Sequence, residues 1–403
     1  MRSVLHNPAF LPIDEQVRRF VVRTDALDAI VEAIERNTGP AHQHLLVVGG
    51  RGFGKSTLVH RVVAELERRP ALASRWTAVV LPQDPYEIGN IGELWLEALR
   101  ALADSTADPR LASLRAELHR DLDPQRVERT ARGALHAYAR DHGRRLLLVV
   151  EHLDMLLEEQ LDDRDGWALR KVLQDDPTFV LLGTALRSFP ALSDPSRPLY
   201  EAFRKIVLEP LDVPEIEVLW ASVTGHAPER ESARAIRVLT GGNPRMVALL
   251  AEITGARPLT DVVEDLGRLV DQRTDYFKAT LDALDGQNRR VFVALASLWR
   301  PATAGEVGKE ARLEGNTAST VLGRLERKGL VEVVGHRRKN KLYQVAERLH
   351  DVFWLMRRRG GADPRIAALL EFMVLFYAPA PPPSDPLVAE VAPTGDPWTT
   401  LTR

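Results

Sequence analysis

A lysine and a serine end a glycine-rich stretch near the amino terminus, in the segment GGRGFGKST. Gly49, Gly54, Lys55 and Ser56 occupy the fixed positions of the pattern G-x-x-x-x-G-K-[ST]. In such a loop the bare glycine backbone lets N–H groups approach phosphates closely, and the start of the following helix adds positive potential. Lys55 is expected on the β- and γ-phosphates and Ser56 on Mg²⁺. The spacing therefore predicts a nucleoside triphosphate site.

The loop needs a strand before it and a helix after it. HLLVV, residues 44–48, has the pattern of a fully buried strand, and STLVHRVVAELERR carries leucine and valine at helical spacing. Strand, loop and helix are thus predicted in the order that a phosphate site requires. The loop residues expected to contact the nucleotide are Gly49, Gly50, Arg51, Gly52, Phe53, Gly54, Lys55, Ser56 and Thr57.

Acidic and polar residues follow two later apolar segments. The apolar run of residues 146–150 leads directly into Glu151, His152 and, two residues on, Asp154. An acid at a strand end is what a nucleotide site needs to hold the water shell of its metal ion. The segment TFVLLGTAL carries Thr184 near its end, where a hydroxyl could orient the attacking water or the γ-phosphate.

In their order and spacing these segments resemble the AAA+ ATPases, specifically the branch of the origin-recognition and archaeal winged-helix ATPases. The resemblance covers roughly residues 7 to 360. It implies an α/β fold, namely a P-loop AAA+ parallel sheet with a helical lid domain, followed by a winged helix-turn-helix domain. It also implies that ATP and Mg²⁺ are bound and that ATP is hydrolysed.

The resemblance assigns roles to further residues. NPAF and FVVRTDALDAIVEAI look like the amino-terminal box of the family, in which Val21, Val22 and Arg23 would line the adenine. LLLVVEHLD looks like the Walker B strand, and LLGTA looks like sensor 1, with Thr184 in the sensing position. LTGGNPRMVALL is similar to the sensor 2 helix, which would bring Arg245 near the γ-phosphate.

An arginine finger is expected in the segment SDPSRPLYEAFRKIVLEPL, where the family keeps it. Arg197 is the first choice and Arg204 the second, and surface arginines are the alternative interpretation of both. A finger would complete the site of a neighbouring copy, so the protein would act as an oligomer.

The acidic segment departs from the family pattern, which ends in Asp-Glu. In one register Glu151 serves the metal and His152 replaces the catalytic carboxylate, with Asp154 kept in place. In the other register Glu151 is the base and Val150 faces the metal, which leaves the ion without its usual acid. The first register is preferred, and it predicts ATP binding with slow hydrolysis, so that bound nucleotide acts as a switch.

The pattern of apolar and polar residues changes along the chain and divides it into predicted domains. The predicted domains are a nucleotide-binding domain over 1–212, a helical lid over 213–283, a winged helix-turn-helix over 284–360, a carboxy-terminal helix over 361–377 and a flexible tail over 378–403.

A winged helix-turn-helix is predicted from the segment after residue 286. An amphipathic helix ends at Pro301, a capping box of Thr303 and Glu306 starts the next helix, and an Asn-capped helix, a glycine stop and two strands with a basic turn follow. In such a module the third helix enters the major groove and the wing contacts phosphates. The expected DNA contacts are Thr317, Ser319, Thr320 and Arg324 on the helix, and Arg337, Arg338, Lys339 and Lys341 on the wing.

The net positive charge of this predicted module suggests a polyanionic partner such as DNA. Residues 287–360 contain sixteen Arg/Lys and seven Asp/Glu, a net charge of +9, and since the whole chain carries −2 the remainder carries −11. A solvated basic surface is the alternative explanation.

Composition limits the class of protein. A chain of 403 residues has room for two or three domains, and 45% hydrophobic and 27% charged residues are typical of a globular protein. The sequence has no cysteine, which excludes disulfides and thiolate metal sites and favours a reducing cytosol. No apolar run approaches the roughly 20 residues of a membrane helix. We expect a cytoplasmic protein without a membrane partner.

Two functions remain open. The first is a nucleotide-switched ATPase that engages DNA through the winged helix, in replication, transposition or defence against foreign DNA. The second is a signalling or scaffold ATPase whose winged helix binds a protein effector. A metabolic kinase is disfavoured because no arginine cluster for a substrate phosphate is apparent.

Overall fold

The computed structural model describes residues 12–39, 42–82, 86–186, 189, 192, 194–254, 274–298, 300–337 and 339–346. The chain divides into two units, Met1–Glu209 and Pro210–Arg403, which are described in turn. The NPAF segment, Arg338, the predicted helix 361–377 and the predicted tail 378–403 lie outside the described residues.

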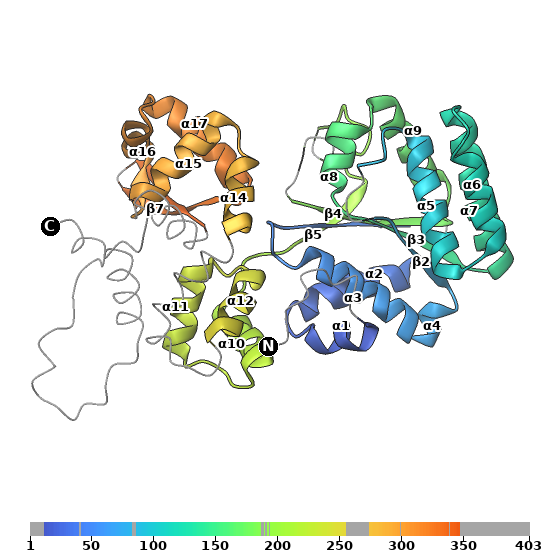
Figure 1. The fold of residues 1–403 in the computed structure, drawn as a ribbon, viewed down its shortest axis with the longest axis horizontal. Helices are drawn as coiled ribbons and strands as arrows, with labels where there is room; N and C mark the ends of the chain where they lie inside the picture. The colour runs from blue at the N-terminus through green and yellow to red at the C-terminus, as the bar shows by residue number, and fades with distance from the viewer. Residues whose placement is uncertain are drawn as a thin grey trace, which may run out of the picture. The chain divides into compact units, whose positions relative to one another are not determined.

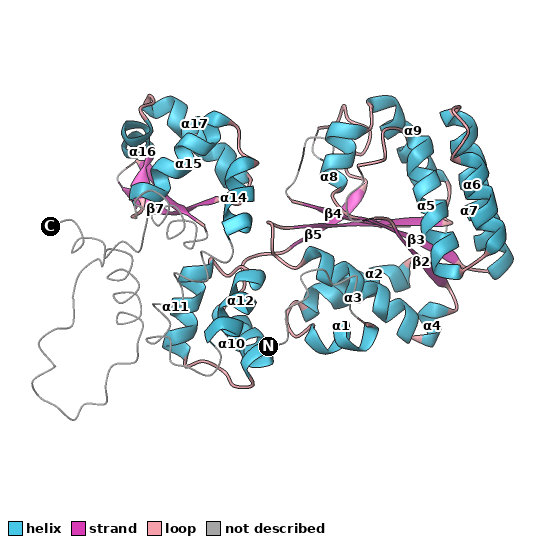
Figure 2. Ribbon diagram, viewed as in Figure 1, coloured by secondary structure: helices cyan, strands magenta, loops and turns pink. Residues whose placement is uncertain are grey.

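A five-stranded parallel sheet forms the centre of the first unit (Figures 1 and 2). Its order is β2-β3-β4-β1-β5, so β1 lies between β4 and β5. The strands are β1 (His44–Val48), β2 (Trp76–Val80), β3 (Arg145–Val150), β4 (Phe179–Ala185) and β5 (Phe203–Val207). The register pairs Val47 with Thr184 and Val150 with Gly183, which brings the carboxyl ends of β1, β3 and β4 to one edge. The predicted parallel α/β sheet is confirmed.

Helices cover both faces of this sheet (Figure 1). One face carries α1 (Ile13–Arg19), α2 (Thr24–Arg36), α3 (Lys55–Arg68) and α4 (Pro70–Ala73). The other carries α5 (Ile91–Thr106), α6 (Pro109–Leu118), α7 (Pro124–His142), α8 (Leu153–Met155), the short π-helix η2 (Leu156–Gln160) and α9 (Asp163–Asp175).

The core follows the two-residue period of the strands. In β3, Leu146 and Leu148 belong to the apolar cluster on the side of α5, α7 and α9, whereas Leu147 and Val149 belong to the cluster on the side of α2 and α3. A strand buried on both faces reads as a continuous apolar run, which is why it was recognisable in the sequence. Trp95 of α5 is fully buried and packs against the ring of Phe179.

The second unit begins with helices. They are α10 (Val213–Thr224), α11 (Arg230–Thr240), α12 (Pro244–Thr254) and α14 (Thr274–Asp282). All elements that the structure describes between residues 213 and 282 are helical, as the sequence predicted. Gly242, between α11 and α12, has φ +68°, and a Cβ there would lie 2.6 Å from the Leu211 carbonyl oxygen.

The remaining elements of the second unit follow the order predicted for a winged helix-turn-helix (Figure 2). They are α15 (Gly286–Leu298), β6 (Ala302–Thr303), α16 (Ala304–Ala311), α17 (Gly315–Arg327), β7 (Val331–Arg337) and β8 (Asn340–Val345). The strands form an antiparallel sheet in the order β6-β8-β7. The buried residues of these helices and strands include Phe292, Leu322 and Tyr343.

The local signals for these elements hold with one exception. The capping box of Thr303 and Glu306 starts α16, and Gly329 has φ +68° just after α17. The expected Asn cap is wrong: α17 begins at Gly315 after Glu314, so Asn316 lies inside the first turn. Its carbonyl oxygen accepts a bond from the Thr320 hydroxyl.

Among the described residues, no helix combines the length and the apolar character needed to cross a membrane.

Candidate nucleotide-binding site

The glycine loop joins β1 to α3 at the carboxyl edge of the sheet. It is anchored where the N–H of Gly49 donates to the Ala185 carbonyl at 3.1 Å and the N–H of Leu208 donates to the Val48 carbonyl at 2.7 Å. Gly52 and Gly54 have φ of +82° and +85°, a region that costs residues with a side chain free energy. Because Gly54 directly precedes α3, the loop ends at a helix N-terminus with its N–H groups available for an anion.

Two further glycines permit close packing of the loop. A Cβ on Gly49 would lie 3.1 Å from the Leu208 Cβ, and a Cβ on Gly50 would lie 3.0 Å from the ring of Phe53. The half-buried Phe53 packs against the apolar cluster that lies between the sheet and helices α2 and α3. The loop residues are therefore fixed by packing as well as by their backbone conformation.

Lys55 is buried at the start of α3, with 8% of its surface exposed. Its ammonium group donates to the carbonyl oxygens of Gly49 at 2.8 Å and Gly50 at 3.0 Å. Burial lowers the pKa of Lys55 to about 8, although the nearby carboxylates of Asp154 and Glu151 act in the opposite direction. Phosphate oxygens would favour the charged form of this ammonium group.

Ser56 and Glu151 meet at the same edge. The Ser56 hydroxyl donates to Oε2 of Glu151, whose side chain is buried at the end of β3. These are hard oxygen ligands, and Mg²⁺ in nucleotide sites takes one or two such protein ligands together with phosphate oxygens. The two residues fit the expected ion, and their contact favours the register in which Glu151 serves the metal.

The residues after Glu151 contact the end of β4. His152 adopts a left-handed conformation with φ +53°, and its N–H donates to the Thr184 hydroxyl at 3.2 Å. Thr184 is almost fully buried, so this bond fixes its side chain between β3 and β1. Asp154 accepts a bond from the Leu186 N–H at 2.9 Å through Oδ2, whereas its buried Oδ1 has no hydrogen-bond partner.

His60 is a site residue that the sequence interpretation missed. It lies one turn after Ser56 on α3, and its Nε2 is 3.8 Å from Oε1 of Glu151. Burial lowers its pKa. The spacing of four residues from Ser56 was a usable signal, because residues four apart share a helix face.

The segment expected to line the adenine is connected to the start of the loop through the residues that follow β5. Val21, Val22 and Arg23 are half-buried between α1 and α2. Arg23 has φ +68° and donates from Nη2 to the Glu209 carbonyl. Since the preceding Leu208 contacts both Val48 and Gly49, this bond connects the segment to the start of the phosphate loop.

The three arginines expected to act near the γ-phosphate lie in different settings. Arg197 forms ion pairs with Asp163 at 2.8 Å and Glu158 at 3.6 Å, and Arg204 is exposed on β5 beside Leu45, where the strands begin. Arg245 lies in the second unit, in the first turn of α12, where its N–H donates to the Asn243 side chain. The finger and sensor 2 roles stay predictions.

The expected DNA contacts occupy α17 and the β7–β8 hairpin. Ser319, Thr320 and Arg324 are exposed and Thr317 is half-buried. On the hairpin, Lys339 is exposed in the turn, Arg337 pairs with Glu306 at 3.2 Å and Lys341 pairs with Glu326 at 3.8 Å.

One family model matches the chain within the first unit. Residues 19–183 match the AAA ATPase domain. No curated protein sequence matches the chain.

Solved structures match the chain at low sequence identity. The Walker-type ATPase PABY2304 of Pyrococcus abyssi has a TM-score of 0.50 at 14% identity, covering 83% of this chain and 95% of that chain. Cdc6p from Pyrobaculum aerophilum has a TM-score of 0.45 at 15% identity, with coverages of 92% and 96%. The Aeropyrum pernix ORC1 protein in complex with DNA has a TM-score of 0.43 at 16% identity, with coverages of 87% and 94%. At these identities, the Pyrococcus match is a likeness of fold.

Proposed function

We propose that this chain, whose residues 19–183 match the AAA ATPase domain, binds ATP with Mg²⁺ as a switch that controls engagement of DNA by the winged helix-turn-helix. The nucleotide would occupy the loop of residues 49–57, with Ser56 and Glu151 on the metal ion. Replication, transposition and defence against foreign DNA are the processes in which such a switch would act.

One observation carries the nucleotide site. The Ser56 hydroxyl and the Glu151 carboxylate are in contact although 95 residues separate them in the sequence. The buried Lys55 ammonium is held by the carbonyls of the same loop. A bound Mg²⁺ ion would neutralise phosphate charge during transfer of the terminal phosphoryl group.

Slow hydrolysis is proposed from the residue that follows Glu151. In the preferred register of the resemblance, His152 would take the place of the catalytic glutamate, and its N–H donates to the Thr184 hydroxyl. An imidazole lacks the negative charge with which a carboxylate holds and polarises a water molecule beside Mg²⁺, and its reach differs. Long-lived bound nucleotide suits a switch better than a motor.

DNA engagement is proposed from charge and element order. Helix α17 presents Ser319, Thr320 and Arg324 on its exposed side, and the strongly basic segment of residues 287–360 contains this helix. The Aeropyrum protein was solved in complex with DNA. A protein effector in place of DNA is the second candidate, because two basic residues of the hairpin pair with acids of their own domain.

One experiment separates these functions. We would measure the mass of the purified chain in solution and its binding to duplex DNA at two salt concentrations, each with and without ATP–Mg²⁺. The proposal predicts ATP-dependent DNA affinity that falls steeply with salt, together with association into an oligomer. Lys55→Ala should remove the nucleotide dependence. Absence of DNA binding at the lower salt concentration would instead favour the protein-effector function.

A further inference from the structure

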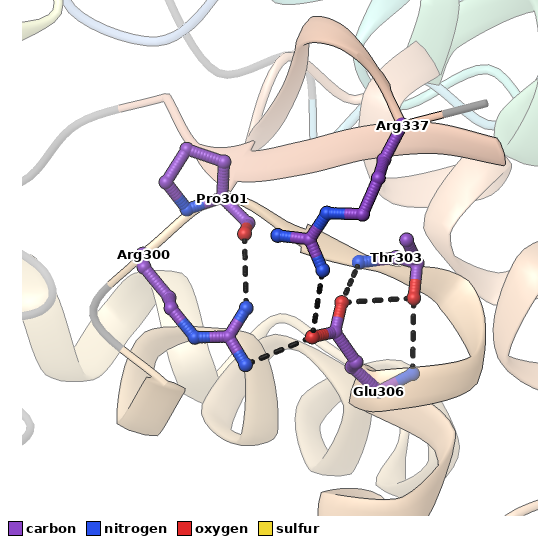
Figure 3. A network of polar contacts seen from close by, with 5 residues as sticks. All are labelled: Arg300, Pro301, Thr303, Glu306 and Arg337. Atoms are coloured by element: carbon purple, nitrogen blue, oxygen red, sulfur yellow. Dashed lines mark hydrogen bonds and ion pairs between the residues drawn. The ribbon is translucent and has the colours of Figure 1, made fainter. Parts of the chain in front are cut away.

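Arg337, one of the wing residues expected to contact DNA, is paired with an acid of its own domain (Figure 3). Oε1 of Glu306 accepts a bond from Arg337 at 3.2 Å. The same oxygen forms an ion pair with Arg300 at 2.8 Å. Glu306 therefore connects the turn after α15 and the end of β7 to the first turn of α16.

The carboxylate of Glu306 is held in place from its other side. Oε2 accepts bonds from the Thr303 N–H at 2.8 Å and the Thr303 hydroxyl at 2.9 Å, in a complete capping box. Burial opposes ionisation of Glu306, but the bonds from Thr303 and the pairing with Arg300 outweigh it and lower its pKa to about 2. The group is a fixed anion at neutral pH.

The donors around this carboxylate are of the kind that also bind phosphate. Two guanidinium groups pair with it and the N–H of Thr303, the N-cap residue of α16, donates to it, and such groups bind phosphate oxygens in proteins. Lys341 and Glu326 form a looser pair at 3.8 Å, with both side chains more than a third exposed. Glu306 is therefore expected to compete with DNA phosphates for its arginines more strongly than Glu326 competes for Lys341.

We propose that Glu306 is an internal competitor of the DNA backbone, which holds Arg300 and Arg337 until a phosphate displaces its carboxylate. The inference rests on the proposed engagement of DNA and adds a residue that limits the affinity. The charge of Glu306 takes up the two arginines that a backbone phosphate would otherwise contact.

The test is the Glu306→Gln variant of the full chain, measured with a labelled duplex oligonucleotide of mixed sequence over a range of salt concentrations. Glutamine keeps the capping box, because Gln also serves at that position of the motif. Freed arginines should increase the affinity and steepen the plot of log K against log salt by about 0.9 for each new phosphate contact. With one or two contacts, the variant should lose ~3- to 12-fold more affinity than the parent between about 50 and 200 mM salt.

Glu310→Gln is the matched control. Glu310 is exposed on the same helix one turn later, and its removal changes the net charge by the same amount. Release of the arginines predicts a clearly smaller effect for Glu310→Gln than for Glu306→Gln. A general effect of charge predicts equal effects, which would overturn the proposal.

A second variant separates competition from a structural role. Arg337→Gln should weaken DNA binding little in the parent and markedly in the Glu306→Gln background. If Glu306 only braced the wing, Glu306→Gln would bind DNA no better than the parent, and the proposal would be wrong while the proposed function stood. If neither chain bound DNA at low salt, the proposed function itself would fail, and this inference with it.

Discussion

Glu151 contacts two residues of α3 that lie one turn apart, Ser56 and His60. The contact with Ser56 places a carboxylate and a hydroxyl where Mg²⁺ would be held. His60 lies near the other oxygen of the same carboxylate. The next residue, His152, contributes its N–H to the positioning of Thr184. The described residues thus bring together an ammonium group, a hydroxyl and a carboxylate, and histidine rather than a second carboxylate follows Glu151.

His152→Glu tests the cause of slow hydrolysis. The parent chain should turn over ATP well below the order of 10 s⁻¹ found for ordinary enzymes. The glutamate would add a general base, whose contribution is typically about 10²–10⁴-fold, so we expect the variant to hydrolyse ATP faster. Steady-state phosphate release measures both rates.

His152→Gln is the control for this substitution, since it changes the side chain without adding a charge. Its rate should stay near that of the parent. A parent rate comparable to that of a motor ATPase would contradict the assignment of His152 to the catalytic position.

At the level of elements, the site depends on close packing between β4 and its neighbours. Gly183 lies in β4 next to Thr184, and a Cβ there would lie 2.7 Å from a methyl group of Leu153 and 3.0 Å from one of Leu46. Gly183→Ala should destabilise the first unit by about 1–3 kcal/mol through overpacking. Chemical denaturation followed by circular dichroism measures the change.

Gly133→Ala is the opposite case within the same unit. Gly133 lies in the middle of α7, and a Cβ there meets no atom within 4 Å. This substitution should stabilise the chain by about 0.4–1 kcal/mol. Equal effects of the two substitutions would show that packing around Gly183 does not govern the stability of the sheet.

The Glu306 network predicts a dependence of stability on pH. The folded-state pKa of Glu306, about 2, lies below its ordinary value of 4.5, so the contribution to stability is present above pH 4.5 and is lost as the pH falls toward 2. The melting temperature of Glu306→Gln should thus lie below that of the parent at neutral pH, and the two should converge on acidification. A difference that stayed constant from pH 7 to pH 3 would exclude this carboxylate as the cause.

The elements were predictable wherever the signal was local. The buried strands, the loop with its helix and the Thr303 capping box are encoded in continuous stretches of sequence. The partners of Glu306 and the position of His60 beside Glu151 depend on segments that meet only in the fold. The Asn316 cap was wrong because Glu314 and Gly315 start the helix earlier, and an Asn near a helix start does not fix the first residue.

For the whole molecule, we expect the nucleotide to influence the basic module through the segment of residues 213–283, the predicted lid. The first unit lies in the acidic remainder of the chain, which carries −11, whereas residues 287–360 carry +9. Arg245 belongs to the lid segment between them and is the residue expected to respond to the terminal phosphate. Loss of this arginine should therefore uncouple DNA affinity from the nucleotide.

The Arg245→Ala variant tests this role. The variant should still bind ATP, because the loop and the metal residues are intact, but ATP should no longer change its affinity for duplex DNA. Fluorescence anisotropy with labelled DNA, with ATP and with ADP, gives both affinities. Retention of the full ATP effect in the variant would remove Arg245 from the switch.

The most direct test of the central claim is a calorimetric titration of ATP into the chain, with and without Mg²⁺, for the parent and for Lys55→Ala. The account predicts Mg²⁺-dependent binding at one site in the parent. In the variant the loss of a buried charge-assisted contact, worth about 1.5–3 kcal/mol or more, should weaken binding at least about tenfold. Equal affinity of Lys55→Ala and parent, or no binding of ATP by the parent, would contradict the assignment of the loop at residues 49–57 as the nucleotide site.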